Sequence, residues 1–440
     1  MSGKKKKIIK NDLVRDSVNT FGTNIIGSAL GLFSSIIILS NVPRSVKGLY
    51  NQVQIWGGGF NTVLGLSVSS AVVYYIAKYT TENAAGAVKK LTAYISAAIV
   101  IISSLLLFIL RDNPMFDSTP VQYLAAIVAY GLLSFVFTIC SMVLRGQNKF
   151  KSYNMVNLTQ RILVTVLAVV IFIKPSASVW VWSTVAISGA MVVFSLYCIK
   201  RWNGERPKPA PENDAEVKAG SMVAYSIKSH VSNVLNYLNI NTGNYIVQGL
   251  YELSDLAVYN TALTLMQQVW ILPDAVSQVI LSRIAAMREN KGKVKLTLIS
   301  AKVVVYVTTA VALLLLLAAK IFLPILFPMY KGAVEPLKYL IVGSIFISYA
   351  KVLGNSIAAY GRPELNIIPN VLGFIVNCGL DFALVPVMGI NGVAAATSAS
   401  LTVQGISCIA IFCIYSHTPF YKLFVPNREE LSNIKNAVKK

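Results

Sequence analysis

Charged side chains are scarce in this chain of 440 residues. Asp, Glu, Lys and Arg together make up 13% of the sequence, whereas 55% of the residues are hydrophobic. Soluble globular domains usually carry about 25% charged residues. A soluble fold is therefore excluded, and apolar runs long enough to cross a bilayer as helices predict an all-α polytopic membrane protein.

Acidic residues are the rarer of the two charge classes. The chain has 18 Asp and Glu against 39 Lys and Arg, which gives a formal net charge of +21. Such an excess can indicate nucleic-acid binding, but here the basic residues separate apolar runs instead of covering one polar face. We therefore expect the membrane as a partner, and no nucleic acid.

Motifs that hold nucleotides, metals or redox centres are missing from the sequence. It contains no P-loop, no CxxC and no HExxH, and its five cysteines all lie inside or at the ends of apolar runs. No loop on the predicted outer side is long enough for a catalytic domain. We expect no cofactor, no metal site, no disulfide and no enzymatic activity. Any driving force then comes from a proton or sodium gradient, the membrane potential or the flow of substrate.

What the chain does contain is a series of about twelve apolar runs, each near the 20 residues that a membrane span needs. Six precede a polar segment in the middle of the chain: 17–40, 52–77, 91–110, 121–144, 152–173 and 178–199. Six follow it: 221–249, 256–282, 299–326, 336–359, 364–387 and 391–416. The basic start at Lys4–Lys7 with a long first run predicts an uncleaved first span and not a signal peptide.

The loops between the runs differ strongly in basic residues. With a cytoplasmic N-terminus, the outer loops keep only Arg44, Lys47, Arg111, Lys174, Lys320 and Lys331. Because cytoplasmic loops are enriched in Lys and Arg, we expect both termini and the central segment on the cytoplasmic side. Trp180 and Trp182 open the sixth run at the predicted outer interface.

The polar segment at 200–220 divides the chain near its middle. It has three prolines, Pro207, Pro209 and Pro211, which disfavour a helix. We predict an N-terminal six-helix lobe at 1–199, a cytoplasmic linker at 200–220, a C-terminal six-helix lobe at 221–416 and a cytoplasmic tail at 417–440. In the tail, Leu431, Ile434 and Val438 favour either a short helix on the membrane surface or a solvated segment.

The two halves resemble each other weakly. GLYN at 48–51 opens the second run and AVYN at 257–260 opens the eighth; LRGQNKF at 144–150 and AYGRPEL at 359–365 join corresponding runs. Because each half has an even number of spans, corresponding segments have the same orientation in the membrane. These resemblances predict two pseudo-symmetric lobes around a central cavity that holds the substrate.

Longer stretches resemble a known family. They are GLYNQVQIWGGGFNTVLGLSVSSAVVYYIAKY at 48–79, AVYNTALTLMQQVWILPDAVSQVILSRIA at 257–285, and 326–401, which begins LFPMYKGA. The chain resembles the polysaccharide (Wzx-type O-antigen) flippases of the multidrug/oligosaccharidyl-lipid/polysaccharide exporter superfamily. It departs from many relatives at Gly243-Asn244, where they carry Asp-Arg or Asp-Lys, and at Ser282, where several have proline.

The resemblance implies a two-lobe transporter that turns over lipid-linked oligosaccharides. The implied substrate is a glycan on undecaprenyl diphosphate, such as an O-antigen repeat unit for lipopolysaccharide. The implied location is the bacterial cytoplasmic (inner) membrane, with other polysaccharide assembly proteins as candidate partners.

Ionisable residues inside the runs are the candidate functional residues, because a charge at bilayer depth costs about 2.5–3.5 kcal/mol on insertion scales. Arg161 lies near the middle of its run, and its lobe offers no acid at that depth. We expect Arg161 to hold the diphosphate, with Lys228 and Lys351 attracting it; the alternative is a cross-lobe ion pair with Asp274 or Asp381. Asp274 and His230 are the candidates for ion coupling. Three alternatives stay open: Lys228 and Lys351 extend to the membrane interface, Asp274 pairs with a lysine, and His230 is buried and neutral.

Three further features have two interpretations each. Asn233, Asn236 and Asn239 follow His230 at steps of three, so this stripe either lines the cavity, with Asn233 and Asn236 as sugar ligands, or joins helices. Gly57-Gly58-Gly59 favours either a bend or close packing. Asp381, near Pro386, either braces the end of its helix, which we favour, or pairs with Arg161.

Two other functions compete with flipping. An ion-coupled drug/cation antiporter of the same superfamily needs an intramembrane acid, and runs one to six have none at depth. A membrane enzyme such as a glycan polymerase needs a sizeable outer loop. Neither fits as well as an anionic lipid-linked substrate.

Overall fold

The fold was analysed in a computed structural model of the chain. The structure describes residues 3–79, 81–117, 119–201, 216–287 and 289–425. Most of the predicted linker and the tail stretch with Leu431, Ile434 and Val438 lie outside the described residues.

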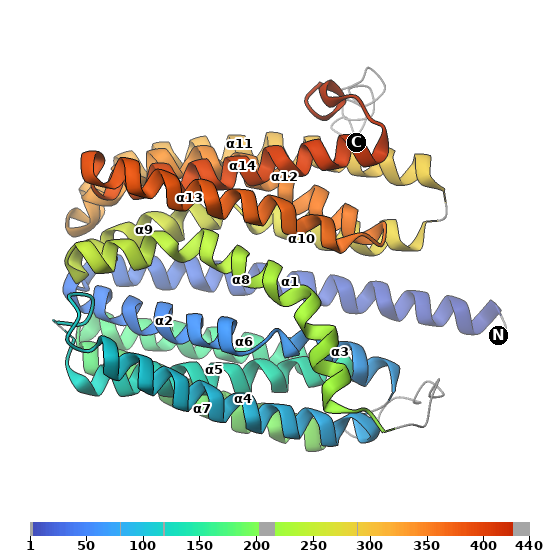
Figure 1. Cartoon of the computed structure of the whole chain (residues 1–440), viewed down its shortest axis with the longest axis horizontal. Helices are drawn as coiled ribbons and strands as arrows, with labels where there is room; N and C mark the ends of the chain where they lie inside the picture. Colours follow the sequence, from blue (N-terminus) through green and yellow to red (C-terminus); the bar gives the residue numbers. More distant parts are fainter. Residues whose placement is uncertain (1–2, 80, 118, 202–215, 288, 426–440) are drawn as a thin grey trace. The chain divides into compact units, whose positions relative to one another are not determined.

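The first half folds into seven helices (Figure 1). They are α1 (Gly3–Asn41), α2 (Arg44–Leu64), α3 (Val68–Lys78), α4 (Thr81–Leu110), α5 (Val121–Gly146), α6 (Phe150–Ile173) and α7 (Ala177–Arg201). Each long helix follows an apolar run of the sequence, and Pro43 and Pro120 stand directly before α2 and α5, where a missing N–H removes no helical bond.

The second half adds seven more helices and three short 3₁₀ turns. They are α8 (Ala219–Leu250), α9 (Leu253–Gln268), α10 (Ile271–Ala286), α11 (Asn290–Leu326), η1 (Pro328–Ala333), α12 (Val334–Ala359), η2 (Pro363–Asn366), α13 (Ile367–Met388), α14 (Ile390–Ser416) and η3 (Phe420–Leu423). The described residues contain no β-strand. The predicted all-α fold is confirmed.

Every predicted span coincides with one helix, apart from the second and the eighth, which are each broken into two. The second run is α2 plus α3, bent by 52°, and the eighth is α9 plus α10. Among the described residues, nine helices, or ten with this bent pair as one span, are long and apolar enough to cross a membrane. The chain is thus a multi-pass membrane protein. The runs that fall short are α8, which carries polar residues, and α9–α10, whose two helices have only 16 residues each.

The break in the second span lies at Gly65–Ser67 and not at the glycine triplet. Leu66 and Ser67 have φ of 48° and 52°, the left-handed region that costs a residue with a side chain about 1–2 kcal/mol. Gly57 instead lies in a close crossing of α2 with α5, since a Cβ there would come within 2.6 Å of the Tyr130 ring. Close packing is therefore the role that the structure gives to Gly57.

A second close crossing joins α12 and α14. A Cβ on Gly343 would lie 2.7 Å from the carbonyl oxygen of Ser398 and 2.8 Å from its Cα. The Gly343 N–H donates to Ser398 Oγ at 2.8 Å. Small residues allow helix backbones to approach in membranes, where packing replaces the hydrophobic effect as the force between helices.

The chain divides into two compact units. One comprises residues 1–234 and 248–257, and the other comprises 235–247 and 258–440. The division falls within α8, so the N-terminal part of this helix packs with the first unit. The lobe boundaries at 199 and 221 stay predictions.

Candidate functional site

Arg161 belongs to a pair of parallel helices, α1 and α6, joined by polar contacts at successive turns. Asn154 Nδ2 donates to Thr20 Oγ1 at 3.1 Å, Ser34 Oγ donates to Thr165 Oγ1 at 3.0 Å, and Asn41 Nδ2 donates to the Phe172 carbonyl at 2.6 Å. On α1 the contact residues Thr20, Gly27, Ser34 and Asn41 recur every seven residues, which keeps them on one face.

The Arg161 side chain lies against Gly27 of α1. A Cβ at Gly27 would come within 2.6 Å of Arg161 Nε, so the glycine makes room for this side chain. The residue is exposed, and within the described part of the chain no acidic group lies within ion-pair distance of its guanidinium. The geometry leaves an exposed cation halfway along a membrane-spanning helix.

His230 and Asn233 meet the break of the second span. The Ser67 hydroxyl lies 3.3 Å from His230 Nδ1 and accepts from Asn233 Nδ2 at 3.0 Å. The left-handed Ser67 is thus tied to the first part of α8. Lys228, two residues before His230, lies outside the residues whose side chains the structure describes. Asn236 is exposed on α8.

The third member of the asparagine stripe has a different environment. Asn239 is fully buried and donates to the Asn370 carbonyl at 3.0 Å. Its own carbonyl oxygen accepts from Asn377 Nδ2 at 3.4 Å, and its Oδ1 accepts from Ser400 Oγ at 3.4 Å. Asn239 therefore joins α8 to α13 and α14.

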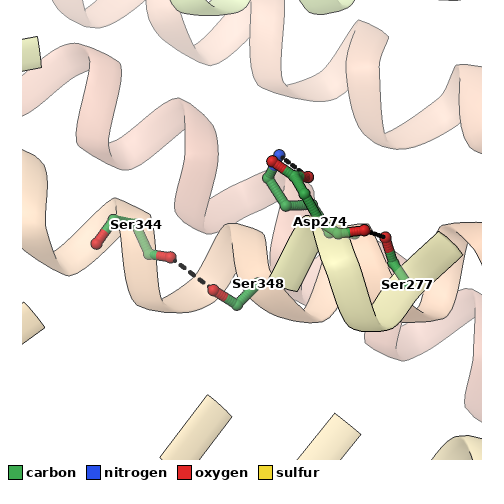
Figure 2. A network of polar contacts seen from close by, with 5 residues as sticks. Asp274, Ser277, Ser344 and Ser348 are labelled. Atoms are coloured by element: carbon green, nitrogen blue, oxygen red, sulfur yellow. Dashed lines mark hydrogen bonds and ion pairs between the residues drawn. The ribbon is translucent and has the colours of Figure 1, made fainter. Parts of the chain in front are cut away.

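Asp274 and Lys351 form one ion pair. Lys351 Nζ of α12 lies 2.6 Å from Asp274 Oδ1, and it sits 4.6 Å from the ring centre of Trp270. Asp274 stands in the first turn of α10, where a carboxylate is favoured by the helix dipole, and its carbonyl accepts from Ser277 Oγ at 2.9 Å. Figure 2 shows the Asp274–Ser277 hydrogen bond and, on α12, the hydrogen bond from Ser348 to the Ser344 carbonyl. From the sequence, Asp274 is a candidate for ion coupling with a lysine partner as the open alternative, and Lys351 is a candidate for substrate binding. The structure has that lysine partner, and it is Lys351.

Polar clusters therefore stand at the break of the second span in both halves. In the first unit the break holds Ser67 with His230 and Asn233. In the second unit the break ends at Trp270, and Asp274 follows with Lys351. The two halves therefore resemble each other in this respect too: each carries candidate polar residues next to the break in its second span.

Asp381 is the functional candidate that the sequence interpretation undervalued. It is 5% exposed on α13, and neither carboxylate oxygen has a hydrogen-bond partner among the described residues. The expected bracing of the helix end by this carboxylate is therefore wrong. Asn377, one turn earlier, is fully buried and its Oδ1 is likewise without a partner. The four-residue spacing of two polar residues in an otherwise apolar run was the signal available in the sequence.

In the second compact unit, α14 makes further polar contacts. Tyr259 Oη and Thr397 Oγ1 lie 3.1 Å apart, and Gln404 Nε2 donates to Ser400 Oγ at 3.4 Å. No group of three or more His, Cys, Asp or Glu residues that could hold a metal is found in the described part of the chain.

Comparison with known proteins gives the family. Residues 59–330, more than half of the chain, match the model of a family described as polysaccharide biosynthesis protein. The chain belongs to this family. The family resemblance expected from the sequence is thereby confirmed. The comparison with curated proteins gives no match.

Solved structures of transporters share the fold of this polysaccharide biosynthesis protein. An inward-facing multidrug resistance MATE family transporter of the MOP superfamily is 13% identical, with 92% of this chain and 98% of that chain covered and a TM-score of 0.63. The lipid II flippase MurJ, in an inward closed conformation, is 15% identical, with 97% and 96% covered and a TM-score of 0.63. A MOP superfamily transporter from Pyrococcus furiosus is 14% identical, with 93% and 95% covered and a TM-score of 0.59. The two-lobe, all-helical fold is that of these transporters.

Proposed function

We propose that the protein is a flippase that moves undecaprenyl-diphosphate-linked oligosaccharides, such as O-antigen repeat units, across the bacterial cytoplasmic membrane by alternating access. The family places the chain in polysaccharide biosynthesis. One observation carries the choice of substrate: Arg161 is an exposed cation in the middle of a membrane-spanning helix, with no acid paired to it in the described part of the chain.

A diphosphate suits this cation. A guanidinium offers two parallel N–H donors to phosphate oxygens, and at bilayer depth an anionic ligand offsets the cost of the exposed charge. Gly27 makes room for the Arg161 side chain against α1, and the α1–α6 contacts hold the two helices in register. Asn233 and Asn236, both exposed on α8, supply amide groups for sugar hydroxyls.

In this proposal Lys228 attracts the anionic lipid, Lys351 does so when its pair with Asp274 is open, and coupling to a proton or sodium gradient involves Asp274 and His230. Lys351 and Asp274 act as one neutral pair, opened or closed during transport. The protein acts as a transporter and performs no covalent chemistry, so it needs no cofactor. Both termini face the cytoplasm, where other polysaccharide assembly proteins deliver the substrate.

An ion-coupled drug/cation antiporter is the second candidate, because MATE family transporters share the fold. Its cationic substrate would need an unpaired acid. Asp274 is paired with Lys351, whereas Asp381 is buried without a partner among the described residues, so this candidate rests on Asp381.

The test replaces Arg161 in a strain from which the native gene has been deleted. Arg161→Ala should abolish surface glycan while the protein stays folded in the membrane, and Arg161→Lys should restore it in part, because a lysine keeps the charge without the fork. Thr165→Val is the matched control, since it removes the neighbouring contact to Ser34 and leaves the guanidinium. Normal surface glycan in Arg161→Ala contradicts the proposal. Loss of drug resistance with unchanged glycan favours the antiporter.

A further inference from the structure

Four tyrosines gather where α3 lies against the start of α8. The rings of Tyr74 and Tyr225 are stacked, with centres 4.6 Å apart and planes at 13°. Tyr75 meets Tyr225 edge-on at 6.0 Å and stacks on Tyr79 at 5.7 Å. We name Tyr74, Tyr75, Tyr79 and Tyr225 the tyrosine platform; all four belong to the first compact unit.

Polar contacts fix the platform in place. Tyr75 Oη donates to the Ser221 carbonyl at 3.1 Å, which ties α3 to α8. Lys78 Nζ donates to Tyr74 Oη at 3.4 Å and lies 5.7 Å and 5.5 Å from the ring centres of Tyr74 and Tyr79. The rings are therefore held before any ligand arrives, and a preorganised surface costs less to bind.

The two exposed tyrosines of the platform are not surrounded by exposed aliphatic side chains on their own helix faces. On α8, Tyr225 shares a face with Ser232, seven residues on, whereas the exposed aliphatic residues Ile227 and Val231 lie on the other side of the helix. On α3 the exposed residues are Ser70, Tyr74 and Ala77, and no large aliphatic side chain is exposed there. Tyr74 and Tyr225 are 39% and 38% exposed.

The contrast with α4 is direct. Tyr94 is 62% exposed, lies 5.9 Å beneath Lys90 Nζ, and stands on a helix whose exposed residues continue with Ile101, Leu105 and Phe108. Such a tyrosine is typical of the aromatic belt at a membrane interface. The platform tyrosines differ from Tyr94 in two ways: they are not flanked by exposed aliphatic side chains, and they contact one another.

We propose that the tyrosine platform is a carbohydrate-binding site that takes a pyranose ring of the lipid-linked glycan. One face of a pyranose presents several C–H groups, which form an apolar patch with slight positive charge and pack on the negative face of an aromatic ring. The surrounding hydroxyls of the sugar need polar partners, and the Tyr74 hydroxyl and Lys78 offer them beside the rings.

This inference rests on the proposed function, and it assigns the sugar a site separate from the diphosphate site at Arg161. Lys78 lies between Tyr75 and Tyr79 at the end of α3 and belongs to the loops expected on the cytoplasmic side, where the glycan is loaded. The platform then recognises sugar whatever lipid carries it.

The experiment measures binding of two probes to the purified full chain in lipid nanodiscs. The first probe is undecaprenyl diphosphate with one N-acetylglucosamine, and the second is undecaprenyl diphosphate without sugar. Tyr74→Leu/Tyr225→Leu keeps apolar bulk but removes the ring faces; Tyr74→Phe/Tyr225→Phe keeps the faces. Tyr94→Leu is the matched control on α4.

We expect the wild-type chain to bind the sugar-bearing probe about tenfold more tightly than the sugar-free one, which is a typical effect of aromatic contacts of this kind. The leucine pair should lose this preference and keep its affinity for the sugar-free lipid. The phenylalanine pair and Tyr94→Leu should retain the preference, and Arg161→Ala should weaken binding of both probes.

The outcomes separate the two proposals. A wild-type chain that binds neither probe overturns the proposed function. A wild-type chain that binds both probes equally, or a leucine pair that keeps the preference, overturns the carbohydrate site and leaves the flippase proposal standing. Equal loss of both probes in the leucine pair also overturns the site, since it indicates a general loss of structure.

Discussion

At the scale of single residues, the ionisable groups inside the helices fall into three environments. Asp274 is paired with Lys351, Asp381 is buried without a partner among the described residues, and Arg161 is exposed without an acid. A paired charge stabilises weakly when both partners are partly exposed, whereas a buried charge without a partner destabilises. The same kind of substitution should therefore have opposite effects at different acids.

Asp381→Asn tests this difference. At alkaline pH, where the carboxyl group is ionised, this variant removes a buried charge while keeping the shape of the side chain, so we expect the free energy of unfolding to rise by about 1–3 kcal/mol. Asp274→Asn should lower it by about 1 kcal/mol or less, because Lys351 loses its carboxylate. Thermal unfolding of the purified variants and the wild type, measured side by side, shows whether each substitution raises or lowers stability. A lower melting temperature for Asp381→Asn contradicts the assignment of an unpaired charge.

If Asp381→Asn is more stable but lowers surface glycan, the carboxylate is retained for function at the expense of stability, a trade common at functional sites. Asn377→Ala serves as the control on the same helix. It removes a second buried polar group one turn away and leaves the charge.

At the scale of helices, the sequence predicted where spans lie but not where they break. The glycine triplet at 57–59 was the visible candidate for a bend, yet α2 runs straight through it, and the bend falls at Gly65–Ser67. Glycine serves both bends and close crossings, so composition alone does not distinguish them. The deciding contact, Gly57 against Tyr130 of α5, depends on a pairing between helices far apart in the chain.

The α12–α14 crossing offers a sharp test of helix packing. Gly343→Ala places a methyl group 2.7 Å from the Ser398 carbonyl oxygen, a backbone atom that cannot swing away, so we expect a loss of about 1–3 kcal/mol in stability. Gly379→Ala on α13 is the matched control, because nothing lies within 4 Å of its Cβ position. There the better helix propensity of alanine should stabilise the protein by up to about 1 kcal/mol.

Detergent melting temperatures of the two glycine variants decide the matter. Equal effects at 343 and 379 contradict the close crossing. A lower melting temperature at 343 alone supports it, and Ser398→Ala then shows whether the Gly343 N–H bond to Ser398 Oγ adds to the contact.

At the scale of the whole molecule, the fold was largely readable from the sequence. Apolar run length placed all twelve predicted runs on helices, nine or ten of them among the described residues long and apolar enough to span, and the quoted stretches named the family, because both signals are local and repeated along the chain. The site was less readable. That Asp274 and Lys351 meet, or that Tyr74 stacks on Tyr225, depends on helix pairings between residues 77 and 151 positions apart, and one sequence carries no direct signal for these.

Orientation in the membrane is the property that the basic residues predict and the fold leaves untested. The parallel contacts of α1 with α6 fit spans one and five running in the same direction. In a variant without native cysteines, single cysteines at positions 210 and 436 should resist an impermeant thiol reagent in intact cells. Lys174→Cys, at the exposed end of α6 on the predicted outer side, should react readily and serves as the positive control. Permeabilised cells should label all three positions, which shows that each thiol is accessible. Labelling of 210 and 436 in intact cells, with protection of 174, would reverse the topology, and the sugar platform near Lys78 would then face the side to which the glycan is delivered.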